Sequence, residues 1–254
     1  MSSSIKSRLL PALVAAFNGI ALAQLPESKI NASDVALGDD FGRNVAIDGD
    51  YAIVGAYLDD DGGSNSGSAY IFKRNGTEWS QEDKIVASDA AQGDFFGESV
   101  DIDGDYAIVG ARGDQDGGYN SGSAYIFKRN GTEWSQEDKI VASDAAADDL
   151  FGWSVSISGD YAIAGARGGD DGGSAAGSAY IFKRSGTDWS QEDKIVASDP
   201  YANDYFGMSV AISGDYAIAG APYDDDGGST AGSAYIFKRS GTDWSQEDKI
   251  VASD

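Results

Sequence analysis

The chain has 254 residues, with 42 acidic and 18 basic side chains and a formal net charge of −24. A charge of this sign and size argues against nucleic acid or an anionic lipid surface as a partner. The absence of histidine and cysteine removes the usual general base, the thiolate nucleophile and the common zinc ligands. The composition therefore disfavours an enzyme, and we expect none.

Residues 1–23 read as a secretory signal peptide. The stretch starts with Lys6 and Arg8, continues with mostly apolar residues and ends in an A-x-A cleavage site before Gln24. We expect the rest of the chain, residues 24–254, to be secreted or extracellular, with the periplasm and the cell surface as alternatives. No other stretch is long and apolar enough for a membrane helix, so no membrane insertion is expected after signal removal.

A unit of 55 residues occurs four times in the chain. Its Phe-Gly start at residue 41 recurs at residues 96, 151 and 206, each 55 residues after the one before. A fixed period of this length indicates one supersecondary unit whose stacked copies bury each other's faces. We place the four units at residues 36–89, 90–144, 145–199 and 200–254.

Each unit reads as four antiparallel strands, called a to d in chain order. Strand b (YAIVGA, residues 51–56) shows no polar alternation, so both of its faces should be buried. Strand d is polar, as an outer edge should be, and the Asn75-Gly76 pair before it is a strong hairpin signal. The pattern predicts an all-β propeller of four-stranded antiparallel blades, with strand a at the axis and strand d outside. The predicted core of the first blade is Phe41, Val45, Ile47, Ile53, Val54, Tyr70 and Phe72.

Residues 29–34 match residues 84–89, the end of strand d, one period earlier. We interpret them as an extra N-terminal strand, which gives five copies of strand d against four of each other strand. Three explanations remain open: this strand competes with the last strand d, it caps an open edge, or the chain is part of a larger propeller. An incomplete ring would allow self-association through an open propeller edge.

The repeated FG…VA…GA…GSAYIF pattern resembles the FG-GAP repeat, the blade unit of the integrin α-subunit head and of many secreted bacterial proteins. The resemblance covers residues 36–254 and implies a β-propeller that is usually extracellular, often adhesive and often calcium-binding. In integrins the calcium loop lies between strands a and b and follows a D-x-D-x-D-G-x-x-D pattern. Here that place holds only Asp48-Gly49-Asp50 in the first unit, so the family's calcium site does not carry over.

Differences between the units gather in two loops, one between strands b and c and one between strand d and the next strand a. In an up-and-down meander these loops leave from the same end of the sheet. Repeat proteins often bind ligands on such a variable face, and the alternative is drift after duplication. The predicted ligand face consists of Tyr57, Arg112, Tyr119, Arg167, Tyr201, Tyr205 and Tyr223.

The loop between strands b and c is rich in aspartate beside paired glycines. Closely spaced carboxylates on a flexible loop can supply the oxygen ligands of calcium. Turn formation and solvation are the alternative explanation, because aspartate bonds its own backbone in turns. The candidate calcium ligands are Asp59, Asp60, Asp61, Asp114, Asp116, Asp170, Asp171, Asp224, Asp225 and Asp226.

We predict a secreted binding or adhesion module that uses the variable loop face, with a protein or a surface glycan as its ligand. One alternative is a structural propeller segment of a larger exported protein, with no ligand of its own. Another is a polysaccharide-active enzyme, since paired carboxylates can hydrolyse glycosides. The carboxylates here are periodic, however, whereas an active site normally breaks repeat symmetry.

Overall fold

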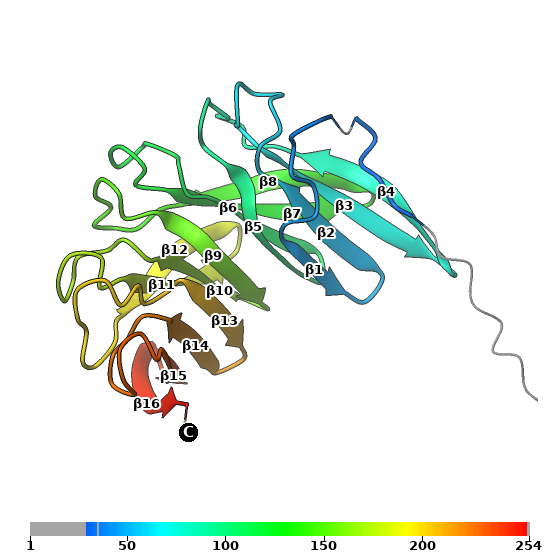
Figure 1. Ribbon diagram of the computed structural model, residues 1–254. Coiled ribbons are helices and arrows are strands. Elements are labelled where there is room, and N and C mark those ends of the chain that lie inside the picture. Colours follow the sequence, from blue (N-terminus) through cyan, green and yellow to red (C-terminus); the bar gives the residue numbers. More distant parts are fainter. Residues whose placement is uncertain (1–28, 35, 253–254) are drawn as a thin grey trace, which may run out of the picture.

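A computed structural model describes residues 29–34 and 36–252 of the chain. The predicted signal peptide, residues 1–23, lies outside the described residues. The described part forms sixteen strands in four four-stranded antiparallel sheets, one from each repeat (Figure 1). It contains no helix with the length and apolar character needed to cross a bilayer.

In every sheet the strands pair in chain order, as β1-β2-β3-β4 does in the first, so the predicted meander is confirmed. The first sheet contains β1 (Val45–Asp48), β2 (Tyr51–Ala56), β3 (Ser68–Asn75) and β4 (Glu78–Ile85). The second contains β5 (Phe96–Asp103), β6 (Tyr106–Ala111), β7 (Ser123–Asn130) and β8 (Glu133–Ile140). The third contains β9 (Phe151–Ser158), β10 (Tyr161–Ala166), β11 (Ser178–Ser185) and β12 (Asp188–Ile195). The fourth contains β13 (Ser209–Ser213), β14 (Tyr216–Ala221), β15 (Ser233–Ser240) and β16 (Asp243–Val251).

The sheets stack as propeller-like blades in an open fan, from the blue first blade to the red end of the fourth (Figure 1). The first strands β1, β5, β9 and β13 contact one another in that order along the inner side of the fan. Strands β6 and β10 are almost wholly buried, which confirms that strand b lies inside its sheet. The outermost strand of each blade is strand d, as its polar sequence predicted.

The core lies between neighbouring blades. At the first joint, Ile53 and Ile71 of the first blade pack with Val100 and Val109 of the second. The backbones also approach closely, because a Cβ atom built on Gly55 would lie 2.0 Å from the carbonyl oxygen of Gly97. The Gly-Ala pair of one repeat therefore meets the Phe-Gly pair of the next, and only glycine fits this contact.

The predicted core of the first blade is buried where it faces the second blade and exposed on the outer face of β1. Ile53, Tyr70 and Phe72 are buried, whereas Phe41 and Val54 are only half-buried. Val45 and Ile47, predicted to be core residues, are exposed, and 66% of the Ile47 side chain surface is accessible. Its equivalent in the second blade, Ile102, is 4% exposed. The reason is that, within the described residues, no blade precedes the first one to cover β1.

Residues 29–34, predicted to be an extra strand, do not form a strand. The strand part of β4 ends at Ile85, so residues 86–89 belong to the turn that follows it. The N-terminal fragment therefore repeats mainly this turn, and it lacks the partner strand that would extend it into a sheet. Its hydrogen bonds are nevertheless those of a repeat, because Ser33 N–H donates to Gln81 Oε1 at 2.9 Å. The next repeat has the same bond from Ser88 to Gln136 at 3.0 Å.

Replacing Ile53 with alanine should lower the free energy of unfolding by about 2–5 kcal/mol, because the change leaves a cavity in the joint between two blades. Urea denaturation of dilute protein measures this. The matched control is Ile218→Ala, which changes the same strand position in the fourth blade. Since Ile218 is partly exposed, its replacement should cost clearly less. Equal losses for the two variants would show that the joints do not form the core.

Candidate functional site

The two variable loops of each repeat lie at the same end of the blades. Within the first joint, Gly93 N–H donates to the carbonyl of Ser64 at 3.0 Å, and Phe95 N–H donates to the carbonyl of Asn65 at 3.1 Å. The loop between the second and third strands of one blade is thus bonded to the segment that leads into the next blade. The expected variable face is present, and two groups of side chains gather on it.

The first group breaks the repeat symmetry. Three repeat positions at this end of the blades each hold at least three different residues across the four repeats. The position just ahead of or within the first strand holds Arg43, Glu98, Trp153 and Met208. The position after the second strand holds Tyr57, Arg112, Arg167 and Pro222. The position before each Phe-Gly pair holds Asp40, Phe95, Leu150 and Tyr205.

These positions form a continuous row of cations and rings. The Arg43 guanidinium lies 4.8 Å from the centre of the Tyr57 ring, and its Nη1 donates to the Tyr57 hydroxyl at 2.7 Å. The Tyr57 and Phe95 rings are 6.0 Å apart, centre to centre. The Arg112 guanidinium is 4.3 Å from the centre of the Phe95 ring. Cation–π contacts of this kind stabilise a row whose members come from different blades.

Trp153 joins the two halves of the row. The guanidinium of Arg112 lies 5.2 Å from the Trp153 ring, and that of Arg167 lies 3.8 Å from it. Arg167 is also 5.2 Å from the Tyr205 ring, which contacts Tyr223 at 5.4 Å. The arginine–aromatic row is the set Arg43, Tyr57, Phe95, Glu98, Arg112, Trp153, Arg167, Tyr205 and Tyr223.

The row contains more positive than negative charge. The buried carboxylate of Glu98 lies 3.4 Å from Arg43 Nη2 and 3.5 Å from Arg112 Nε. Arg167 makes no ion pair within the described residues, and its buried Nε has no hydrogen-bond partner there. Burial, together with the nearby charge of Arg112, lowers the pKa of the Arg167 guanidinium. An anion placed beside Arg167 would therefore meet an unsatisfied donor.

A cavity of about 410 Å³ borders this row on the inner side of the fan. Arg43, Glu98, Trp153 and Met208, which share one repeat position, all line it. The cavity is polar at the arginine and glutamate and apolar at the tryptophan and methionine. The lining thus combines a charged donor, a charged acceptor and two apolar side chains.

Of the predicted ligand-face residues, the structure brings together Tyr57, Arg112, Arg167, Tyr205 and Tyr223. Tyr119 and Tyr201 are exposed on the same loops and lie outside the row of ring and guanidinium contacts seen among the described residues. The predicted ligand face did not include Arg43, Phe95, Glu98 and Trp153. Arg43, Glu98 and Trp153 share one repeat position, and Phe95 shares the position of Tyr205, so aligning the four units shows where these residues differ.

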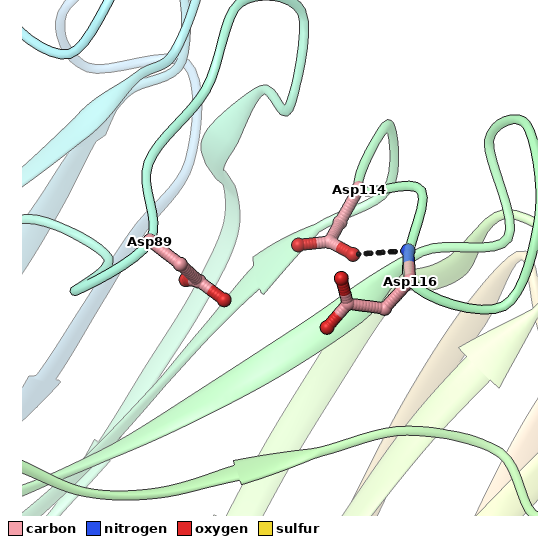
Figure 2. Close-up of side chains that lie close together, drawn as sticks. All are labelled: Asp89, Asp114 and Asp116. Atoms are coloured by element: carbon pink, nitrogen blue, oxygen red, sulfur yellow. Dashed lines mark hydrogen bonds between the residues drawn. The ribbon is translucent and has the colours of Figure 1, made fainter.

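The second group is an aspartate cluster around a lysine, repeated in each blade. In the second blade, Lys139 Nζ on β8 donates to Asp89 at 2.7 Å, Asp114 at 2.9 Å and Asp116 at 2.6 Å. The hydroxyl of Tyr125 lies 2.9 Å from a carboxylate oxygen of Asp89 and of Asp114, and it can donate its one proton to either. Figure 2 shows the three carboxylates turned toward a common space, with Asp116 N–H donating to Asp114 at 3.0 Å.

The same arrangement recurs with small changes. In the first blade Lys84 contacts Asp34, Asp59 and Asp61. In the fourth blade Lys249 contacts Asp199, Asp224 and Asp226. In the third blade Lys194 contacts only Asp144 and Asp171, because Gly169 stands at the position of Asp114.

The predicted calcium ligands divide into two sets. Asp59, Asp61, Asp114, Asp116, Asp171, Asp224 and Asp226 belong to the lysine clusters. Asp60, Asp170 and Asp225 instead accept a backbone N–H five residues later in their own loop. This second set performs the turn chemistry considered as the alternative. The aspartates after the outer strand, such as Asp89, were not among the predicted ligands, although they complete every cluster.

Oxygen atoms of Asp89, Asp114 and Asp116 lie within 4.8 Å of one another, so these residues could hold a metal ion. The ammonium of Lys139 is bonded to the same three carboxylates, however. Burial acts to lower the pKa of Lys139, but its hydrogen bonds to the carboxylates outweigh burial and raise that pKa. Burial acts to raise the pKa of Asp89, but the hydrogen bonds from Lys139 and Tyr125 outweigh it and lower that pKa. Each group therefore holds the other in its charged form.

Comparisons with known proteins agree with the repeat. A family model described as "FG-GAP repeat" matches residues 26–72, 79–127, 134–182 and 189–237. Among solved structures, the crystal structure of the Saccharomyces cerevisiae Sqt1 is similar to this chain, with 10% sequence identity and a TM-score of 0.49. The similarity covers 84% of this chain, which spans about half, 48%, of that one. No curated protein matches the chain.

Replacing Lys139 with methionine should lower the free energy of unfolding at neutral pH by about 1–3 kcal/mol, because three carboxylates lose their charged donor. The pKa of Asp89 is lowered in the folded state, so its contribution is complete above its unfolded value near 4 and is lost as the pH falls through the folded value. The difference between the variant and the original protein should therefore shrink below about pH 4. Urea titrations across this pH range measure it.

The control for this prediction is Lys238→Met on β15, since Lys238 pairs with Glu247 and both side chains are well exposed. An ion pair that is open to solvent contributes little to stability, so this variant should lose less. A loss for Lys139→Met that stays constant down to pH 2 would show that the cluster's charges do not stabilise the fold.

Proposed function

Because the chain belongs to the FG-GAP repeat family, we propose that it is a secreted binding module whose ligand binds at the arginine–aromatic row. The observation that supports this most is the break in repeat symmetry. The outer strands are nearly identical in all four repeats, whereas the row combines three arginines, one glutamate and five rings, and of these only Arg112 and Arg167 repeat one another at the same position. A ligand that contacts several blades at once accounts for such a break, since each blade then meets a different part of it.

The ligand of this site is an anion with apolar surface beside its charge. Arg112 and Arg167 both lie against Trp153, and the single buried acid of the row, Glu98, pairs with Arg43 and Arg112. A planar guanidinium binds carboxylate, sulfate or phosphate oxygens in pairs. The half-buried ring of Tyr205 and the exposed ring of Tyr223 extend the row beyond the charges. An acidic polysaccharide outside the cell combines both properties, which fits the glycan ligand expected from sequence.

Binding is favoured over the two alternatives. A purely structural segment gives no reason for the different residues that the repeats carry at the positions of the row. Catalysis by a carboxylate pair needs a free acid, whereas Glu98 lies between two guanidiniums. The sequence also lacks histidine and cysteine. Export from the cell is supported by the signal-like start at residues 1–23.

The double variant Arg112→Met with Arg167→Met should bind an acidic polysaccharide at least about tenfold more weakly, because charge-assisted hydrogen bonds contribute about 1.5–3 kcal/mol. Calorimetric titration with polygalacturonate measures this, with neutral dextran as the uncharged comparison. The control variant is Arg74→Met, which removes an exposed arginine paired with Asp50 at the opposite end of the first blade. Equal weakening by the double variant and the control would contradict a site at the row.

Calcium binding at Asp89, Asp114 and Asp116 is the second candidate function. The short separations of these carboxylates favour it, and the family resemblance points the same way. The three hydrogen bonds of Lys139 oppose it, because calcium could enter only by displacing a bonded ammonium. We propose that the lysine ammonium neutralises the cluster in place of a metal ion.

The original protein should therefore show equal shifts of its melting temperature in calcium and sodium chloride at matched ionic strength. Lys139→Met should gain an additional rise that depends on calcium concentration, because the vacated carboxylates can then bind the ion. Adding Asp116→Asn to that variant should remove the gain. Differential scanning fluorimetry measures all three proteins. A calcium-specific rise in the original protein, removed by Asp116→Asn alone, would restore the calcium prediction.

A further inference from the structure

The two ends of the fan expose faces that are buried at every inner joint. On the first blade the exposed face contains Val45 and Ile47, whose equivalents Val100 and Ile102 are buried. On the fourth blade it contains Ile218, which is 37% exposed, whereas its equivalent Ile53 in the first blade is fully buried. We call the first the head face (Val45, Ile47, Trp79) and the second the tail face (Tyr216, Ile218, Ile236, Ile250).

Each inner joint contains two specific contacts besides its apolar packing. At the first joint, Trp134 N–H donates to Asp83 Oδ2 at 2.8 Å, and the Trp134 ring meets the edge of Tyr51 at 6.0 Å. The hydrogen bond recurs between Trp189 and Asp138 and between Trp244 and Asp193. The ring contact recurs between Tyr106 and Trp189 and between Tyr161 and Trp244.

The unmatched halves of these contacts stand at the two ends of the fan. Trp79 on the first blade has neither its tyrosine nor its aspartate within the described residues. Tyr216 and Asp248 on the fourth blade are the tyrosine and the aspartate that have no tryptophan there. The tail face is hollowed by a cavity of about 330 Å³ lined by Tyr216, Ile218 and Ile236 among others. The head and tail faces are thus the two halves of a fourth joint.

The backbone at the tail face also has the space that a joint requires. A Cβ atom on Gly55 or Gly110 would lie 2.0 Å from a carbonyl oxygen of the next blade. A Cβ atom on Gly220, the equivalent residue of the fourth blade, would meet nothing closer than 3.8 Å. Alanine at Gly220 therefore fits the isolated chain but would collide with a blade docked there.

We propose that the tail face binds the head face of a second copy of this chain, with the contacts of an inner joint. The first blade of that copy already has Ser33 and Asp34 in place on Gln81 and Tyr70, so only the blade faces need to meet. The interface joins two different faces and is heterologous, so repeated addition gives a closed ring or an open chain of copies. Because each copy carries a charge of −24, salt should strengthen the association by screening repulsion.

Sedimentation equilibrium of the purified protein at moderate salt tests this with one variant for each face. Gly220→Ala blocks the tail face, and Ile47→Asp blocks the head face by placing a charge at an exposed position. Ile250→Lys is a second tail variant in case Gly220→Ala fails to fold. The control variant is Ser64→Ala, because Ser64 is exposed on the loop face.

The original protein and Ser64→Ala should have masses of two or more chains that rise with concentration, and each blocked variant alone should be a single chain. An equimolar mixture of the two blocked variants should give a complex of two chains and no more, because one intact tail and one intact head remain. Single chains in both the original protein and the mixture would overturn the proposal. So would an oligomer that persists in Gly220→Ala and Ile250→Lys, since the tail face would then not be its interface.

Discussion

The close approach of two backbones at each joint between blades determines the rest of this structure. Gly55 lies so near the carbonyl of Gly97 that any side chain would collide, and the two glycines keep neighbouring inner strands in contact. This distance lets Ile53 pack against the next blade. It also places equivalent residues of successive repeats side by side, so that Arg43 pairs with Glu98, 55 residues later in the sequence. The arginine–aromatic row depends on that placement.

Repetition made the fold predictable and hid part of the site. The absence of polar residues in strand b and the Asn75-Gly76 turn were sufficient to order the strands of each blade, because both reflect local rules. The exposure of Ile47 could not be predicted, since it arises because no blade covers β1 within the part of the chain that the structure describes. Lys139 and Asp89 were overlooked because every repeat carries their equivalents, and a residue that never varies offers no contrast. Finding the row required knowing that one position of successive blades comes side by side.

The lysine clusters place a cation of the chain itself among the aspartates of each blade. Asp89 follows the outer strand of the first blade, whereas Lys139, Tyr125 and Asp114 belong to the second. The cluster therefore attaches the connecting segment to the blade that it enters, and the same attachment recurs at Asp34 on the first blade. Aspartates that would otherwise repel one another thus fix the path of the chain between blades through their shared lysine.

The equivalence of the joints has a consequence for how this protein can change over generations. Removal of residues 145–199 would bring the second and fourth blades together through matching halves of a joint, so the core would re-form without any compensating substitution. The same deletion would remove Trp153 and Arg167 together and leave Arg112 facing Met208 and Pro222. Gain or loss of whole units thus changes which side chains meet on the loop face, while the contacts between neighbouring blades stay the same.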